Sequence, residues 1–190
     1  MARRVSRMLA LGTPAPDFGL TDPSGRRFAL RDFAGSKGLL VAFICNHCPF
    51  VKHLLGGFVE FAREYGPKGI AIVAINPNDA AKYPEDSPES MKRIAAEKGF
   101  TFPYLIDETQ AVAKAYQAIC TPDFFLFDAA RKLAYRGQFD ASRPSNALPV
   151  TGSDLRAAAD ALLAGKPIGN QIASIGCSIK WKSGQAPEWA

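Results

Sequence analysis

The sequence lacks a long apolar run and a secretory leader pattern. No stretch of its 190 residues approaches the ~20 consecutive apolar residues that a membrane-spanning helix needs. Near the N-terminus only Met8–Leu11 is apolar, which is shorter than the roughly 7–15 residues of a signal-peptide core, and Pro14 and Pro16 follow at once. These absences predict a cytoplasmic protein that has no membrane partner.

The sequence also lacks a nucleotide-binding fingerprint, internal repeats and blocks of one charge. No GxGxxG segment follows an expected strand, so we expect no nucleotide cofactor. The net charge of +5 is spread among acidic residues, which argues against a nucleic-acid partner. The length suits one domain. We expect it at residues 14–165, between a flexible N-terminal tail (1–13) and a C-terminal tail (166–190) that carries Cys177.

Cysteine and histidine are scarce, with four and two residues, yet three of these six lie in the segment Cys45–Pro49. The continuous apolar run Leu39–Ile44 before it predicts a buried strand. Pro49 favours the first turn of a helix, and apolar residues recur at helical spacing from Phe50 to Tyr65. The CxxC motif is therefore expected at a strand-to-helix turn, where the helix dipole favours a thiolate on Cys45.

His47 lies between the two cysteines. A positive charge this close to a sulfur lowers the thiol pKa, so we expect the pKa of Cys45 to lie below about 7. In a cytoplasmic protein such a dithiol is more typical of redox activity or metal binding than of a structural disulfide. The alternative is that His47 is a solvated loop residue with no influence on the sulfur.

The rest of the chain alternates strand and helix patterns. A turn at Asp22–Gly25 predicts a short antiparallel entry. Further strands are expected at 69–76, 104–106, 124–127 and 133–135. Helices are expected from Ser87–Glu89 onward, from a capping-box pattern at 107–110 to about residue 116, and from 153 to 164. This order predicts an α/β sandwich with parallel strands followed by an antiparallel pair.

Several of these segments together resemble the thioredoxin superfamily. They are Ala15–Phe18, the Asp22–Gly25 turn, the apolar strand, Cys45–Pro49 and Thr121–Phe124. More narrowly, the chain is similar to the redoxin branch, which holds alkyl hydroperoxide reductase and thiol-specific antioxidant (AhpC/TSA) proteins. The resemblance covers roughly residues 14–165. It implies a thioredoxin-like three-layer α/β sandwich with a central mixed sheet and an N-terminal β-hairpin extension. The segment 174–182 resembles an uncharacterised bacterial subgroup that carries C-N-H-C-P.

The resemblance also implies a mechanism. Cys45 attacks a disulfide, in a protein or a small molecule, and Cys48 resolves the mixed disulfide. Thr121–Pro122 matches the cis-proline loop that faces the CxxC, where the Thr121 backbone pairs with an extended partner chain. An external thiol reductant then returns the electrons. The resemblance leaves the oligomeric state open, with a homodimer as one option.

The two remaining cysteines have open roles. Cys120 directly precedes Thr121, so a third sulfur near the CxxC is one interpretation, and a buried small apolar side chain is the favoured one. Cys177 lies near Lys180 and Lys182, whose charges would lower its pKa. It is either an accessory resolving thiol, a partner for Cys120, or an idle cysteine of the tail.

The chain departs from the thioredoxin pattern, because no acid occurs in the strand at 39–44. A peroxidase is the first alternative, with Cys48 or Cys45 as the peroxidatic cysteine. Cys48–Pro49 fits the resembling P-x-x-x-T-x-x-C motif, but Val41 and Cys45 replace its proline and threonine, and Pro122 stands where an arginine is expected.

A metal site is the second alternative. Cys45, His47, Cys48 and His53 supply four ligand types, but structural zinc sites draw on two separated pairs, so we expect no metal. The third alternative is an interaction domain with an inactive dithiol.

Overall fold

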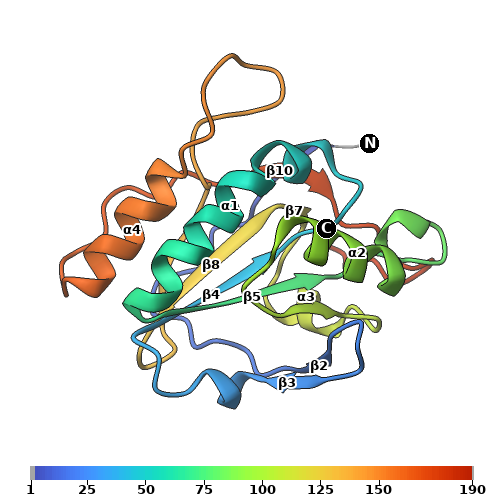
Figure 1. Cartoon of the computed structure of the whole chain (residues 1–190), viewed down its shortest axis with the longest axis horizontal. Coiled ribbons are helices and arrows are strands. Elements are labelled where there is room, and N and C mark those ends of the chain that lie inside the picture. Colours follow the sequence, from blue (N-terminus) through green and yellow to red (C-terminus); the bar gives the residue numbers. More distant parts are fainter. Residues whose placement is uncertain (1–2, 190) are drawn as a thin grey trace.

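The computed structural model describes residues 3–189, and its centre is a seven-stranded mixed sheet (Figure 1). The strand order is β3-β2-β6-β5-β4-β8-β9. The strands are β2 (Gly19–Thr21), β3 (Arg27–Ala29), β4 (Gly38–Phe43), β5 (Ile70–Asn76), β6 (Tyr104–Ile106), β8 (Asp123–Asp128) and β9 (Leu133–Gly137). Strands β4, β5 and β6 are parallel, whereas β8 and β9 are antiparallel additions. The predicted N-terminal hairpin is present as β2–β3, closed by a hydrogen bond from the Gly25 N–H to the Asp22 carbonyl.

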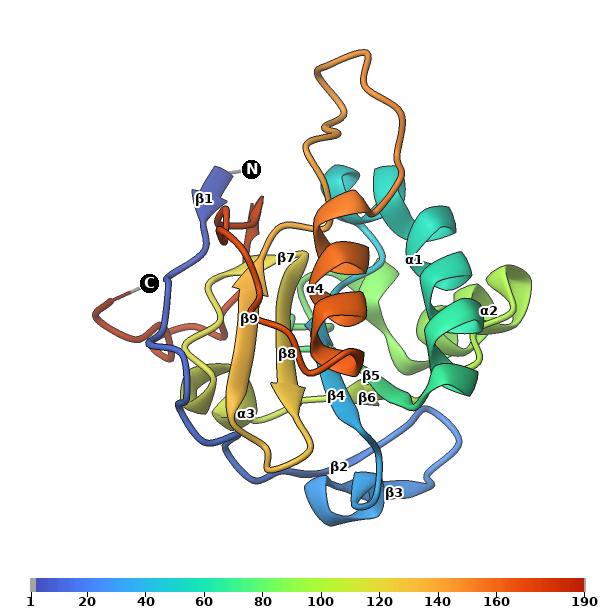
Figure 2. The same ribbon diagram turned by 90° about the vertical axis from the view of Figure 1, so that its left-hand side faces the viewer.

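Helices cover both faces of this sheet, which gives the predicted three layers. They are α1 (Pro49–Lys68), α2 (Pro88–Lys98), α3 (Ala111–Ala115) and α4 (Ser153–Leu163), with short 3-10 helices η1 (Leu30–Phe33) and η2 (Pro84–Asp86). Figure 2 shows α1 and α4 on one side of the sheet and α3 on the other. None of the helices in the described chain combines the length and the apolar character needed to cross a membrane.

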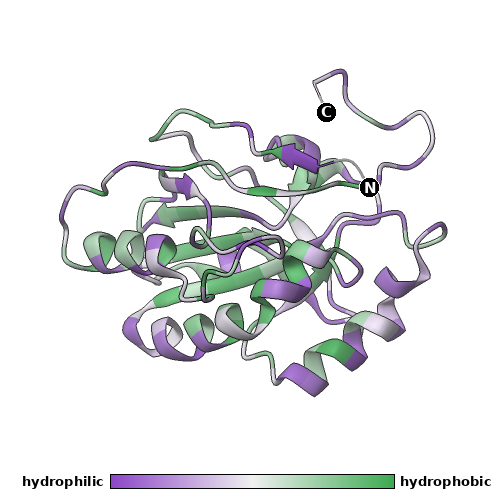
Figure 3. Ribbon diagram, turned by 90° about the horizontal axis from the view of Figure 1, so that it is seen from above, coloured by the Kyte–Doolittle hydropathy of each residue, from purple (hydrophilic) through white to green (hydrophobic). Residues whose placement is uncertain are grey.

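The core is divided by β4, whose six residues are all buried. Leu40 and Ala42 face a cluster with α1 and α4, and Leu39, Val41 and Phe43 face a cluster with α3. Successive side chains of a strand point to opposite faces, so a central strand must be apolar at every position. The strands accordingly form the hydrophobic interior in Figure 3.

The register of the central strands positions the site. The last residue of β4, Phe43, pairs with Asp123, the first residue of β8. The turn that follows β4 carries the CxxC, and the segment that precedes β8 is Thr121–Pro122. The antiparallel register therefore brings two segments about 75 residues apart to one end of the sheet.

The two tails expected outside the domain contain strands of a second, three-stranded sheet. Its order is β1 (Arg3–Val5), β10 (Ile175–Ser178) and β7 (Cys120–Thr121). Within the segment 1–13, which the sequence predicts to be a flexible tail, Arg3–Val5 forms a strand that pairs with β10. Such pairing joins the two ends of the chain, and no local periodicity indicates it.

Candidate functional site

The CxxC motif lies at a strand-to-helix turn, as the sequence predicts. The Ile44 N–H continues the pairing of β4 with a hydrogen bond to the Ile75 carbonyl. Cys48 is the N-cap of α1, and Pro49 is its first residue. Backbone N–H groups of the first turn have no partner within the helix, so they point their positive ends toward Cys48.

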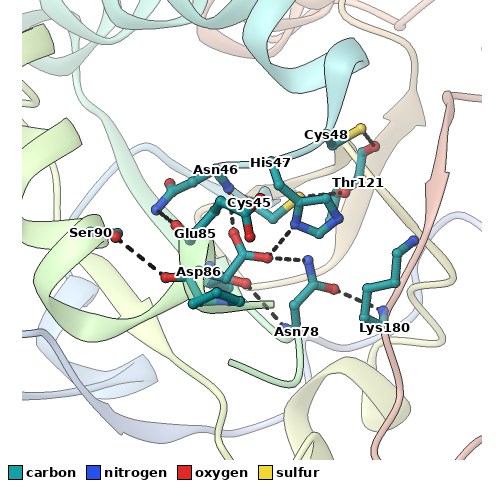
Figure 4. Close-up of polar contacts among 12 residues, drawn as sticks. Cys45, Asn46, His47, Cys48, Asn78, Glu85, Asp86, Ser90, Thr121 and Lys180 are labelled. Atoms are coloured by element: carbon teal, nitrogen blue, oxygen red, sulfur yellow. Dashed lines mark hydrogen bonds and ion pairs between the residues drawn. The ribbon is translucent and has the colours of Figure 1, made fainter. Parts of the chain in front are cut away.

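Both sulfurs of the motif contact Thr121 (Figure 4). The Cys45 Sγ lies 3.1 Å from the Thr121 Oγ1, and the Cys48 thiol donates to the Thr121 carbonyl at 3.1 Å. Both cysteines are free thiols, with exposed fractions of 1% and 0%. A single threonine therefore holds the dithiol on the side that faces β8.

The two thiols differ in their tendency to ionise. A hydrogen bond from the Cys45 thiol is the main cause that lowers the pKa of Cys48 to about 5. Burial opposes this shift, and hydrogen bonds from Cys177 and the Val51 N–H add to it. Burial raises the pKa of Cys45, and the neighbouring Cys48 and Asp86 raise it further. The Thr121 carbonyl favours a protonated Cys48, but it is one acceptor against several donors. The expected low pKa of Cys45 is thus wrong, because the Cys45 thiol itself, Cys177 and the Val51 N–H all donate to Cys48.

His47 is part of a buried polar network rather than a solvated loop residue. Its Nδ1 lies 2.6 Å from the Asp86 Oδ2, and its ring stacks on Tyr83 with centroids 5.0 Å apart. Asp86 also accepts hydrogen bonds from the Asn46 N–H at 2.6 Å and the Asn78 amide at 2.8 Å. These bonds outweigh burial and hold the pKa of Asp86 below its usual value, so the carboxylate is charged at neutral pH.

Asp86 is a site residue that the sequence did not indicate. A ring nitrogen of His47, the Cys45 sulfur and an Asp86 oxygen lie within 4.8 Å of one another. The strand at 39–44 has no acid, and the acid beside the CxxC instead comes from η2, which lies far along the chain at Pro84–Asp86. The segment 84–88 reads as a turn with a helix start, and nothing in it predicts that its aspartate faces a cysteine.

A prediction follows for His47→Ala. The pKa of Cys45 should rise, because the Asp86 carboxylate then lies beside the sulfur without its histidine partner. The rate of alkylation of Cys45 against pH, read by mass spectrometry, measures this. His53→Ala is the matched control, since the His53 Nε2 bonds the Ser142 Oγ at 2.7 Å, away from the dithiol. An unchanged titration of Cys45 would contradict the role of His47.

The Thr121–Pro122 peptide bond is cis, as the resemblance implied. The Thr121 backbone, however, is not open to a partner chain. It pairs with Cys177 of β10 in an antiparallel register. The role of Thr121 and Pro122 in positioning a substrate stays a prediction, and in this structure the C-terminal segment lies along Thr121.

The two other cysteines lie on β7 and β10. Cys120 is fully buried, and its thiol donates to the Pro122 carbonyl at 3.6 Å, which supports the interpretation of a small core side chain. Cys177 is 4% exposed. Burial, together with the hydrogen bond to Cys48, raises the pKa of Cys177 to about 12, so the nearby lysines do not make it a thiolate. The structure thus brings Cys177, from the tail, to the CxxC.

A buried ion pair lies next to the cis-proline loop and includes Asp123, the residue that follows Pro122. The Arg136 guanidinium donates to the Asp123 carboxylate at 3.1 Å, and both side chains are fully buried. The Ser6 hydroxyl donates to Asp123 at 2.7 Å and accepts from the Arg136 Nε at 3.1 Å. Ser6 follows β1, so this cluster ties the N-terminal strand to the residue after Pro122.

The four ligands considered for a metal do not converge. His53 points to Ser142, and the structure groups Cys45 and His47 with Asp86 instead. In that group the Nδ1 and the carboxylate oxygen are bonded to each other at 2.6 Å. Among the described residues the buried Nε2 of His47 has no hydrogen-bond partner.

A mixed sheet with a sulfur pair at the start of its first long helix defines the thioredoxin-like class of proteins. The fold is shared with a crystal structure assigned as the thiol:disulfide interchange protein DsbE of Chlorobium tepidum. That structure has a TM-score of 0.63 and 24% identity, and the match covers 82% of this chain and 99% of the other. Residues 11–136 match the AhpC/TSA family, to which the chain belongs. The resemblance to redoxins is thereby confirmed.

Two further relatives bear on function. Thiol-disulfide oxidoreductase ResA of Geobacillus kaustophilus is 32% identical over 120 residues, which are 63% of this chain and 64% of that protein's length. A crystal structure of an uncharacterised conserved protein from the same organism is 56% identical, with a TM-score of 0.94 over 96% of this chain and 97% of the other.

Proposed function

We propose that the protein is a thiol–disulfide oxidoreductase whose Cys45–Cys48 pair alternates between a dithiol and a disulfide. The observation that carries this proposal is the pair of buried thiols at the N-terminus of α1, both in contact with Thr121. Hydrogen bonds lower the pKa of one of them, Cys48, to about 5. A thiolate is the attacking species in disulfide exchange, and a second thiol beside it is what resolves the product. The name of the related ResA supports the same chemistry.

Either sulfur can begin the reaction, and both orders end in the Cys45–Cys48 disulfide. The resemblance implies attack by Cys45, but the hydrogen bonds concentrate the negative charge on Cys48. We therefore assign the attack to Cys48. Its thiolate forms a bond to one substrate sulfur, and the other substrate sulfur leaves with the electron pair. Cys45 then loses its proton, attacks the Cys48 sulfur and displaces the second substrate thiolate.

The His47–Asp86 pair assists the second step. Cys45 must lose a proton in a buried place where burial raises its pKa. A ring nitrogen of His47 lies within 4.8 Å of the Cys45 sulfur, and the Nδ1 of His47 lies 2.6 Å from the Asp86 Oδ2. His47 is thus the proton acceptor for Cys45, and Asp86 orients it. The substrate is a disulfide of a protein or a small molecule, and an external thiol reduces the enzyme again. A cytoplasmic location stays a prediction from the sequence.

Cysteine variants test the proposal. In Cys45→Ser/Cys177→Ala, which removes both thiols placed beside Cys48, the mixed disulfide between Cys48 and a disulfide substrate such as oxidised glutathione should accumulate, and turnover should fall to background. Mass mapping identifies the sulfur that is linked. Cys120→Ala is the control and should turn over like the wild type. Accumulation in Cys48→Ser instead would restore the order with Cys45 as attacker. Wild-type protein that never forms Cys45–Cys48 would overturn the proposal.

A peroxidase is a second candidate, favoured by one observation. The thiolate lies on Cys48, which directly precedes Pro49, as in the redoxin peroxidase motif. Attack on a hydroperoxide would give a Cys48 sulfenic acid, which Cys45 would condense to the same disulfide with loss of water. Consumption of hydrogen peroxide that is faster than oxidation by oxidised glutathione would favour this candidate.

A further inference from the structure

The C-terminal strand β10 occupies the edge where the family resemblance places the substrate. Cys177 lies opposite Thr121, and Ser178 lies opposite Cys120. The approach of the two backbones is close, because a Cβ on Gly176 would lie 2.1 Å from the Thr121 carbonyl oxygen. That oxygen is the atom to which the Cys48 thiol donates. The Thr121 carbonyl thus lies between Gly176 of β10 and the Cys48 sulfur.

The segment after β10 is tied to the histidine network. The Lys180 N–H donates to the Asn78 Oδ1 at 2.8 Å, and the same asparagine donates to Asp86 (Figure 4). The Lys180 carbonyl accepts from the Asp79 N–H at 2.9 Å and from Gln110 at 3.0 Å. These bonds of Lys180 hold the segment after β10 in place, and with it Cys177.

We propose that Cys177 is a third redox thiol, which takes the disulfide over from the buried pair and presents it to the external reductant. The proposal rests on the Cys45–Cys48 chemistry proposed above. The Cys177 sulfur attacks the Cys48 sulfur of the Cys45–Cys48 disulfide. A Cys48–Cys177 bond forms, the Cys45–Cys48 bond breaks, and the electron pair leaves with Cys45. The proton of Cys177 ends on Cys45, so no external oxidant or reductant is consumed.

The charges of the site favour this step after oxidation. In the reduced protein burial opposes ionisation of Cys177 most strongly. The hydrogen bond to Cys48 and the negative charge of Cys48 add to this effect, whereas Lys180 favours ionisation. Oxidation removes the charge from Cys48 and leaves the lysine. All three cysteines are buried, and Cys177 is the most exposed of these residues, at 4% against 1% and 0%.

The test uses the full chain with Cys45→Ser, in which the first disulfide cannot form. The reduced variant is treated with oxidised glutathione, quenched, digested and mapped by mass spectrometry. We expect a Cys48–Cys177 disulfide and little glutathione on Cys48. Cys45→Ser/Cys177→Ala should instead retain glutathione on Cys48. Cys45→Ser/Cys120→Ala is the matched control, because Cys120 is a buried cysteine that pairs with Ser178, next to Cys177 on β10. This variant should still form the Cys48–Cys177 disulfide.

Two outcomes separate this inference from the proposed function. Persistent glutathione on Cys48 in the Cys45→Ser variant, with Cys177 still open to alkylation, would overturn the role of Cys177. The proposed function would stand if wild-type protein still formed Cys45–Cys48 and turned over. As a second measurement, oxidised Cys177→Ala should be reduced by dithiothreitol more slowly than oxidised wild type, while Cys120→Ala should not differ. Equal rates for all three proteins would contradict the relay to the reductant.

Discussion

Arg136→Met is expected to lower the free energy of unfolding by about 3–5 kcal/mol near neutral pH, since removing one partner of a buried ion pair leaves the other charge uncompensated. Arg136 and Asp123 are both fully buried. Arg136 also donates to the Tyr116 and Gln117 carbonyls at 3.4 and 3.1 Å, and its guanidinium lies 4.1 Å from the centre of the Phe125 ring. Methionine keeps the packing of the aliphatic part but none of these polar contacts.

Chemical denaturation of the reduced protein at several pH values measures this loss. Burial raises the pKa of Asp123 to about 6, although Arg136 opposes the shift. Without Arg136 the pKa of the Asp123 carboxyl in the folded protein should rise further. The loss of unfolding free energy in Arg136→Met should thus be largest at high pH, where Asp123 is charged. It should shrink as the pH falls, because the folded variant then holds a neutral Asp123.

Two variants complete this prediction. Arg136→Met/Asp123→Asn should recover much of the stability, since no buried charge remains. Arg93→Met is the control, because Arg93 pairs with Glu97 at 3.8 Å on the exposed face of α2 and should change stability little. A loss in Arg136→Met that matches this control would contradict the structural role of the buried pair. Because Ser6 bonds both partners, Arg136→Met should also loosen β1 and, through β10, the position of Cys177.

The reduced protein is expected to lose stability steadily as the pH falls from about 9 to about 5, whereas the oxidised protein should not show this slope. The pKa of Cys48 is lowered from 9.0 to about 5 in the folded state, first through the hydrogen bond from Cys45. Between these values the unfolded chain holds a proton on Cys48 that the folded chain lacks. Stability therefore rises with pH in this window, with a slope approaching 1.4 kcal/mol per pH unit.

Unfolding curves of reduced and oxidised protein across this range measure the difference. The stability that ionised Cys48 contributes is fully present at a pH above the thiol's pKa in the unfolded chain. It is lost at a pH below the thiol's pKa in the folded chain. A disulfide between Cys45 and Cys48 removes both titrations, so the difference between the two forms isolates them. Cys48→Ser should lose the slope in the reduced form, and Cys120→Ala should keep it. Parallel curves for reduced and oxidised wild-type protein would contradict a thiolate on Cys48.

Much of the fold follows from local patterns in the sequence. The apolar run at 39–44 can only be a central strand, because a strand buried on both faces has no polar position. Pro49 and the apolar positions from Phe50 to Tyr65 specify the helix that carries the CxxC at its start. The dithiol and the hairpin turn were therefore recognisable from residue types and their order, whereas the cis-proline loop was predicted only from the resemblance to the thioredoxin superfamily.

Which thiol ionises, and which groups surround it, was decided by the tertiary structure. The sequence places His47 between the cysteines, but only the packing of η2 brings Asp86 to it. Likewise, only the folded chain brings the Cys45 and Cys177 thiols and the Val51 N–H to Cys48 as hydrogen-bond donors. Hydrogen bonds between segments far apart leave no periodicity in either segment. The sequence by itself thus determined that a dithiol lies at a strand-to-helix turn. The long-range pairing of β10 with Thr121 decided that a third sulfur lies beside the dithiol, because strand register is set by contacts across the fold and not by neighbours along the chain.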